Sequence, residues 1–163
     1  MPRPRKQLDF RAAAEALTAP GAEHASMAAI ARRLEVAKPT LYRMAGSREE
    51  LVQLCVDAEA ERLMEQIHGA RGLGGFLGFV EDSPAGFLLL FGGRHPEARQ
   101  AVRRVENRLG EDLRRRGVPQ AQALAAGLLG LAAGVARRAI EDGVPLDSLD
   151  LQAIFERVVS AGT

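Results

Sequence analysis

The chain has 163 residues, and its charges nearly cancel, with 22 Lys or Arg against 21 Asp or Glu. Hydrophobic residues make up 47% and charged residues 26%, which excludes a disordered or collagen-like chain. The single cysteine excludes an intramolecular disulfide and a cysteine-based zinc site. Only 4% of the residues are aromatic, whereas alanine recurs throughout, so the composition favours an all-α fold.

The charge is unevenly distributed along the chain. Residues 1–48 hold nine Lys or Arg and four Asp or Glu, a net charge of +5, whereas residues 49–163 hold 13 and 17, a net charge of −4. A basic N-terminal part is typical of a polyanion-binding module joined to a second function. An unevenly charged, solvated surface would give the same asymmetry. Only a sequence motif can distinguish such a surface from a polyanion-binding module.

The N-terminal part predicts short helices separated by tight turns. Apolar residues at helical spacing predict a first helix over residues 10–17, ended by Pro20. Ser26 is a typical N-cap for a short helix over residues 27–34. A third short helix is predicted from Pro39 to about Met44, because proline is tolerated in a first helical turn.

A fourth, longer helix is predicted after these three. Ser47 and Glu50 have the spacing of a capping box, and the helix they open can run to about residue 67. Leu54 and Cys55 are expected on its buried apolar face. Cys55 is therefore predicted to be a buried structural thiol rather than a reactive one.

Two short helices joined by a turn, with a helix before and after them, form a helix-turn-helix in its DNA-binding setting. Residues 26–51, SMAAIARRLEVAKPTLYRMAGSREEL, resemble the DNA-binding signature of the tetracycline-repressor (TetR) family of bacterial transcriptional regulators. The resemblance covers residues 8 to about 60. It implies an all-α protein with an N-terminal three-helix DNA-binding domain, residues 1–47, joined to a helical regulatory and dimerisation domain, residues 48–163.

The third helix carries side chains suited to DNA. Lys and Arg can donate to guanine or to phosphate, Thr to either, and Tyr commonly to phosphate. The family resemblance implies that this helix enters the major groove, that Tyr42 and Arg48 hold the DNA backbone, and that Ser26 lies against another phosphate. The expected DNA-binding residues are Ser26, Lys38, Pro39, Thr40, Tyr42, Arg43 and Arg48.

The chain departs from the family pattern in three places. Glu35 occupies the turn position where the family usually has glycine, which costs about 1 kcal/mol if the backbone there is left-handed. Ala45 replaces a customary large aromatic residue. Ala28 and Ala29 cannot hydrogen-bond to bases, so direct readout rests on few side chains.

The C-terminal part predicts a helical body. Gly127, Gly130 and Gly134 place small residues along one helical stripe, which permits close helix approach. The resemblance implies a homodimer formed through the last two helices, at about 119–140 and 148–160. The helices predicted in this part cover residues 76–80, 84–91, 96–113, 119–140 and 148–160.

The uncharged segment over residues 118–136 could in principle be a transmembrane helix. It consists mostly of Ala, Gly and Gln with few Leu and Val, whereas a spanning helix needs about 20 predominantly apolar residues. We interpret it as a buried helix and expect no membrane partner. The N-terminus has no apolar stretch behind its basic residues, so we expect a cytoplasmic protein.

The resemblance also implies an inducer pocket within the body, although the sequence identifies no inducer. Five apolar residues can line such a pocket, but each can equally belong to a plain core. His68 and His95 are expected to cap helix ends or to face solvent, and the three histidines lack metal-ligand spacing, so no metal or cofactor is predicted. The candidate pocket residues are Met64, Phe76, Phe79, Phe87 and Phe91.

The sequence therefore predicts a sequence-specific DNA-binding transcriptional regulator. The form we expect is a repressor that binds a palindromic operator as a homodimer and is released by a ligand. The same fold acting without a small-molecule inducer is the first alternative. A small cytoplasmic helical enzyme is a remote one, because GxSxG, HExxH and paired-cysteine motifs are all missing and no catalytic residue is predicted.

Overall fold

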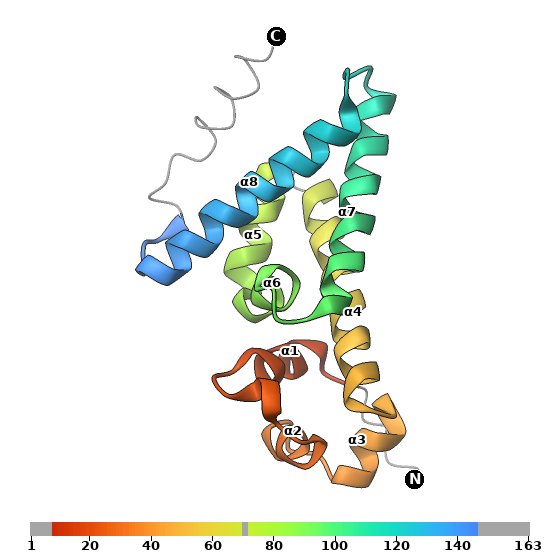
Figure 1. Ribbon diagram of the computed structural model, residues 1–163, viewed down its shortest axis with the longest axis vertical. Helices are drawn as coiled ribbons and strands as arrows, with labels where there is room; N and C mark the ends of the chain where they lie inside the picture. Colours follow the sequence, from red (N-terminus) through yellow and green to blue (C-terminus); the bar gives the residue numbers. More distant parts are fainter. Residues whose placement is uncertain (1–7, 70–71, 147–163) are drawn as a thin grey trace. The chain divides into compact units, whose positions relative to one another are not determined.

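A computed structural model describes residues 8–69 and 72–146 of the chain. These residues form eight α-helices and one short 3-10 helix with no strand among them, so the all-α prediction is confirmed (Figure 1). In chain order the helices are α1 (Phe10–Thr18), η1 (Ala22–His24), α2 (Met27–Arg33), α3 (Lys38–Ala45), α4 (Arg48–Gly69), α5 (Leu73–Asp82), α6 (Pro84–Phe91), α7 (Pro96–Arg115) and α8 (Ala121–Asp142).

The chain divides into two compact units that interleave along the sequence. The first unit combines Met1–Arg62 with Ser83–Ala101, and the second combines Leu63–Asp82 with Val102–Thr163. The long helices α4 and α7 each contribute to both units. The compact units are therefore not contiguous in sequence.

The first unit holds α1 to α3, most of α4, α6 and the first turn of α7. Within it α1 packs against α6, and α2 packs against α3. Each of these helices buries apolar side chains, and such short helices are stabilised by this burial rather than by their own length. The fully buried apolar side chains of this unit include Leu17, Ile30, Leu41, Leu51, Phe87 and Leu89.

The helix ends follow local sequence signals. At the start of α4, the Glu50 amide donates to the Ser47 hydroxyl at 3.1 Å, and the Ser47 amide donates to a Glu50 carboxylate oxygen at 2.8 Å. Both hydrogen bonds of the predicted capping box are therefore present. The Ser83 hydroxyl caps α6 by accepting from the Gly86 amide, and Pro84 follows it in the first turn.

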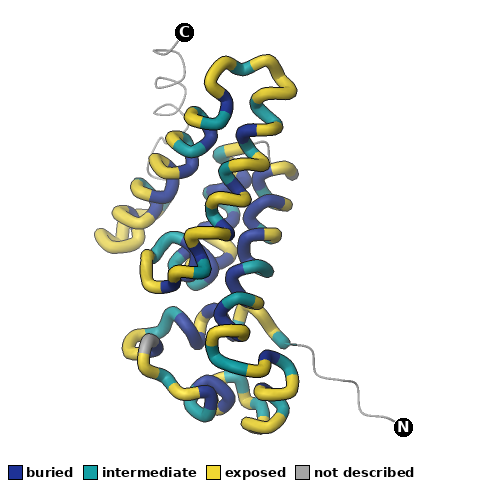
Figure 2. The backbone as a smooth tube through the Cα atoms, turned by 45° about the vertical axis from the view of Figure 1, so that its right-hand side comes forward, coloured by how far each residue is buried: buried dark blue, intermediate teal, exposed yellow. Residues whose placement is uncertain are grey.

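The second unit holds the end of α4, α5, most of α7, and α8. Within it α5 packs against α8. Burial alternates along α8, whose inward face consists mainly of alanines and whose opposite face is exposed (Figure 2). Helix α8 is therefore buried on one face only, whereas the sequence analysis interpreted residues 118–136 as a buried helix.

Two details differ from the sequence prediction. Leu54 is 40% exposed, because the buried stripe of α4 runs through Leu51, Cys55 and Val56 and leaves Leu54 on the opposite face. Helix α8 begins at Ala121 rather than at Pro119, since Gln120 adopts a left-handed backbone with φ 50°. The last predicted helix, at 148–160, lies outside the described residues.

Helix α8 is long and apolar enough to cross a bilayer by length and composition alone. It has 22 residues, with a mean hydropathy of 1.5 in its most apolar window, of which 33% is buried. A core helix of a soluble protein passes the same test, so this finding is weak evidence for a membrane span.

Candidate functional site

Helices α2 and α3 form a two-helix motif with a small buried centre. Ile30 of α2 and Leu41 of α3 are both fully buried. The Val36 amide donates to the Ala31 carbonyl at 3.0 Å, which closes the turn between the helices. Glu35 in this turn has φ 53°, so the left-handed backbone considered at this position is present. Apolar contacts and the Val36–Ala31 hydrogen bond therefore hold the motif together, against the backbone strain at Glu35.

The outward side of α3 carries the predicted basic and hydroxyl side chains. Lys38, Pro39 and Arg43 are exposed, Tyr42 is 43% exposed, and Thr40 is half-buried. The Lys38 ammonium lies 5.8 Å from the centre of the Tyr42 ring, within the range of a cation–π contact. The surface thus combines two cations with two hydroxyls, a combination that can contact phosphates and base edges.

Ser26 and Arg48, the two predicted DNA-binding residues outside α3, each make a hydrogen bond within the protein. Ser26 is exposed and caps α2, because its hydroxyl accepts from the Ala29 amide at 3.3 Å. Arg48 is half-buried at the start of α4, where its guanidinium donates to the Ala22 carbonyl at 3.1 Å. Arg48 therefore ties α4 to η1 within the protein.

His95 contributes a buried ring close to Arg48. It is 8% exposed, although the sequence placed it at a helix end facing solvent or serving as a cap. Its Nε2 atom and the Arg48 Nε atom are buried without a hydrogen-bond partner among the described residues. Burial, and then the charge of the Arg48 guanidinium, lower the pKa of His95, so its ring is neutral at pH 7.

A buried carboxylate lies on α4 in the same unit. Glu59 is 2% exposed and accepts a hydrogen bond from the Ser83 hydroxyl at 3.2 Å. Burial raises the pKa of Glu59 in spite of this bond and the nearby charges of Arg62 and Arg11. The sequence signal for it was an acidic residue four positions after Cys55, on the stripe that turned out to be buried.

Cys55 is buried as predicted. It is fully buried and free, and burial followed by the charge of Glu59 raises its pKa to about 12. The thiolate is the nucleophilic form of cysteine, so this side chain is unreactive in the folded protein.

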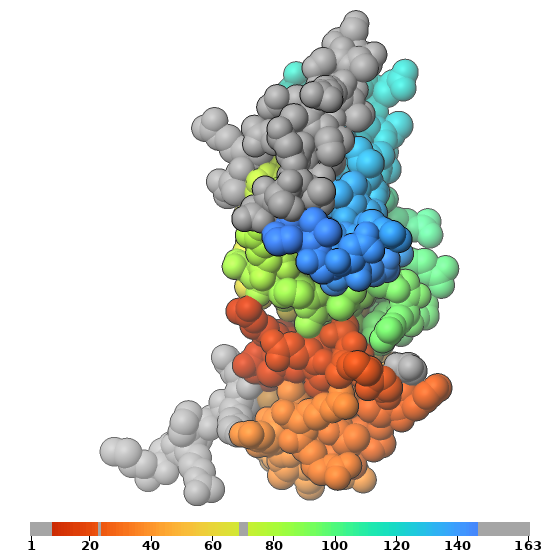
Figure 3. All heavy atoms as spheres, turned by 90° about the vertical axis from the view of Figure 1, so that its left-hand side faces the viewer, coloured from red at the N-terminus to blue at the C-terminus, as the bar shows by residue number. Residues whose placement is uncertain are grey.

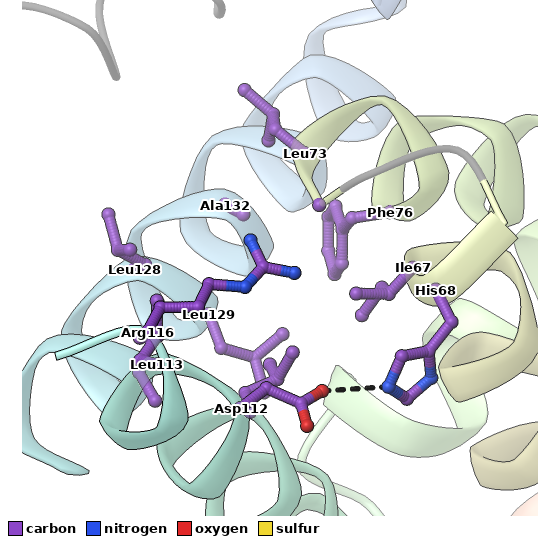
Figure 4. Close-up of a pocket in the computed structure, with 13 residues that line it drawn as sticks. Ile67, His68, Leu73, Phe76, Asp112, Leu113, Arg116, Leu128, Leu129 and Ala132 are labelled. Carbon is purple, nitrogen blue, oxygen red and sulfur yellow. Dashed lines mark hydrogen bonds and ion pairs between the residues drawn. The ribbon is translucent and has the colours of Figure 1, made fainter. Parts of the chain in front are cut away.

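The second unit contains a cavity of about 560 Å³, which lies within the range of small-molecule sites (Figure 4). The end of α4, the start of α5, the C-terminal end of α7 and the first half of α8 line it. Most of its wall is apolar, and three polar side chains, His68, Asp112 and Arg116, interrupt it.

His68 and Asp112 form a pair in this wall. His68 Nε2 lies 2.7 Å from an Asp112 carboxylate oxygen, and His68 Nδ1 lies 2.9 Å from the Met64 carbonyl oxygen. A hydrogen bond from His68, followed by one from Arg115, holds the pKa of Asp112 below its usual range despite partial burial. Asp112 is therefore a carboxylate at neutral pH. The His68 ring is exposed, as the sequence analysis allowed, and it is also held by two oxygens.

The candidate pocket residues do not all meet at this cavity. Phe76 lines it, whereas Met64 and Phe79 are buried in the same unit without lining it. Phe87 and Phe91 belong to the first unit, where their rings stack with centroids 5.3 Å apart. Most of the lining comes instead from α7 and α8, whose residues were not among the candidates for the pocket. Only the fold of the body shows which of them border empty space.

Metal-ligand clusters of three or more His, Cys, Asp or Glu residues do not occur among the residues that the structure describes. The cavity is thus a mainly apolar site with one carboxylate, one imidazole and one guanidinium.

Comparison with known proteins identifies the N-terminal segment. Residues 10–55 match a family model described as bacterial regulatory proteins, tetR family. The match begins with α1, spans α2 and α3, and ends within the second turn of α4. No curated protein matches the chain at a significant level. On this match and on the helix-turn-helix formed by α2 and α3, residues 10–55 are a DNA-binding segment of the tetR type, and the chain is a DNA-binding transcription regulator.

Proposed function

We propose that this regulator is a repressor that binds a palindromic operator as a homodimer and releases it when a small molecule enters the cavity. The observation that carries the DNA-binding part is the exposed, basic face of α3 within the segment that matches the family model. The functional division follows the prediction, with residues 1–47 reading DNA and residues 48–163 sensing and dimerising.

The proposed roles on α3 follow from side-chain chemistry. Tyr42, with its phenol exposed, binds a phosphate of the DNA backbone, and Lys38 at the start of the helix reads base edges together with Thr40. Ser26 and Arg43 add backbone contacts, and Pro39 packs beside them. Arg48 binds the backbone as well, while its bond to Ala22 orients the start of α4.

The dimer is proposed to form through α8 and the predicted helix at 148–160. The exposed stripe of α8 supports this, because a Cβ added at Gly127, Gly130 or Gly134 would meet no atom within 4 Å. Leu131 and Ile140 expose apolar surface on the same helix, each to 37%. The C-terminal end of α8 lies at the molecular surface in the view of Figure 3.

The ligand-released form is favoured over a regulator without an inducer by the cavity of about 560 Å³, since a filled core offers a small molecule no site. The two-state scheme requires that the ligand prefer a body conformation in which the recognition helices do not fit adjacent major grooves. A cytoplasmic location without a membrane partner and the lack of an enzymatic activity are part of the same proposal.

The first test is selection of bound sequences from random duplex DNA by the full chain at near-physiological salt. A palindrome with half-sites about one helical turn apart is the expected result. Binding that depends on salt but enriches no sequence would contradict sequence-specific regulation.

Variants then separate the proposed roles on the selected operator and a scrambled duplex. Tyr42→Phe should weaken binding to both duplexes alike, whereas Lys38→Ala should cost about 1–3 kcal/mol on the operator only. Arg103→Ala, an exposed arginine of α7, is the matched control and should change neither affinity. If Lys38→Ala weakened binding to both duplexes equally, as Tyr42→Phe is expected to do, this division of roles would be refuted.

A further inference from the structure

The cavity of the second unit has its polar side chains at one end. His68 comes from the end of α4, Asp112 comes from the last turn of α7, and Arg116 directly follows α7. The remaining wall, from α5 and α8, is apolar and includes Leu73, Phe76 and Leu129. A site with this lining favours a ligand with an apolar body and a small polar end.

Two of the three polar side chains are already paired within the protein. His68 faces the Asp112 carboxylate on one ring nitrogen and the Met64 carbonyl on the other, at 2.7 and 2.9 Å. Asp112 also pairs with Arg115, which lies three residues further along α7. These groups therefore form a closed network whose main partners are protein atoms.

Arg116 differs from this network. Among the residues that the structure describes it makes no ion pair, and its guanidinium points into the cavity in Figure 4. Its backbone is held where α7 ends, because Gly117 adopts φ 77° and the Val118 amide donates to the Leu113 carbonyl at 3.1 Å. This is the Schellman arrangement, in which glycine takes the left-handed position.

The charges around the cavity favour an anion. Asp112 is balanced by Arg115 and His68, so the Arg116 guanidinium is an unbalanced positive charge at the polar end. The parts of α5 and α8 that line the cavity contribute no charged side chain. A guanidinium binds a carboxylate through two parallel hydrogen bonds, whereas it repels a cationic ligand.

We propose that this cavity binds an amphipathic monoanion, whose apolar body lies between α5 and α8 and whose carboxylate is held by Arg116. This inference rests on the proposed function, for which it names the class of effector.

The test measures binding of three probes to the full chain by isothermal titration calorimetry at pH 7.5, without DNA and below the aggregation limit of each probe. The probes are decanoate, 1-decanol and decylamine in its charged form, and 4-phenylbutyrate with 4-phenylbutanol repeats the comparison on an aryl body. Each anion should bind at least about tenfold more tightly than its alcohol, the size expected for hydrogen bonds to a charged group. Decylamine should bind more weakly than 1-decanol.

Two variants assign the preference to Arg116 and to the cavity. Arg116→Gln, at an exposed position, should lower the affinity for each anion to that for its alcohol and leave the alcohols unchanged. Ala132→Leu, which fills the apolar wall, should weaken all the probes. Arg103→Gln, on the exposed side of α7, is the matched control and should behave as the wild type.

The outcomes separate this inference from the proposed function. An anion preference that survives Arg116→Gln, equal affinities for anion and alcohol, or binding of neither probe pair would each overturn the ligand class. Release of the selected operator is measured separately. Selective binding of the anions without release of DNA would leave the ligand class standing and contradict the ligand-released repressor.

Discussion

Glu35 stores strain in the turn between α2 and α3. Its φ of 53° is left-handed, a conformation that costs a residue with a Cβ atom about 1 kcal/mol or more relative to glycine. Glu35→Gly should therefore raise the free energy of unfolding by up to about 1 kcal/mol, measured by urea denaturation. Glu35→Ala keeps the Cβ atom and should bring no gain. A lower midpoint for the glycine variant would show that the Glu35 side chain stabilises more than its backbone costs.

Glu59 makes the stability of the first unit depend on pH. Burial raises its pKa in the folded state, so the folded state holds the proton more tightly than the unfolded state does. Stability then falls as the pH rises from the ordinary carboxyl range up through the raised pKa. Glu59→Gln cannot ionise, and its side-chain carbonyl can still accept from Ser83.

The variant Glu59→Gln should therefore melt at a higher temperature than the wild type at pH 8, with a smaller difference at pH 5. Melting curves across this range, followed by circular dichroism, measure the effect. Glu65→Gln, an exposed carboxylate on the same helix, is the control for a general charge effect. A gain that stays constant with pH would contradict the linkage to Glu59.

At the scale of the element, helix boundaries were predictable where a side chain caps them. The predicted caps Ser26 and Ser47 both accept hydrogen bonds from backbone amides of the helices they open. The start of α8 was predicted two residues early, because the left-handed backbone of Gln120 has no sequence signal. Leu54 was misplaced since α4 is buried along a stripe that only its tertiary neighbours define.

The DNA-reading residues were easier to predict from the sequence than the residues that line the cavity. The DNA-reading residues lie within one continuous segment, and their spacing on α3 already places Lys38, Tyr42 and Arg43 on the outside. The cavity brings together residues from four helices, from Ile67 to Ala132, and depends on what their packing leaves empty. Phe76 was the one candidate among five that lines it.

Two adjacent glycines of α5 have opposite surroundings. A Cβ added at Gly75 would lie 2.0 Å from the Gln66 carbonyl oxygen of α4, whereas a Cβ at Gly74 would meet no atom within 4 Å. Gly75→Ala should therefore cost about 1–3 kcal/mol by overpacking. Gly74→Ala should be neutral or stabilise by up to about 1 kcal/mol, because alanine favours the helix. Chemical denaturation of both variants measures the contrast, and equal effects would contradict the close approach of α5 to α4.

At the scale of the whole molecule, α8 joins the two proposed activities of the body. Ala125, Leu129 and Ala132 on its inner face border the cavity, and Gly127 and Gly130 lie on its outer, open face. Anything that shifts the inner face of α8 also moves the proposed dimer surface, since both belong to one rigid helix. Ligand occupancy can therefore alter the geometry of the dimer without any contact to the DNA-reading helices.

Gly130 allows the dimer to be tested without disturbing the single chain. A side chain at this exposed position meets no atom within 4 Å, and replacing a glycine inside a helix stabilises it by about 0.5–1 kcal/mol at best. Gly130→Glu should therefore leave the fold intact but bury a charge between two α8 helices, so sedimentation equilibrium should show a monomer. The affinity for the operator should also fall, because each half-site is then bound by a separate monomer. Gln100→Glu, exposed on α7, adds the same charge elsewhere and should remain a dimer. A dimeric Gly130→Glu with unchanged operator affinity would exclude this stripe of α8 as the interface.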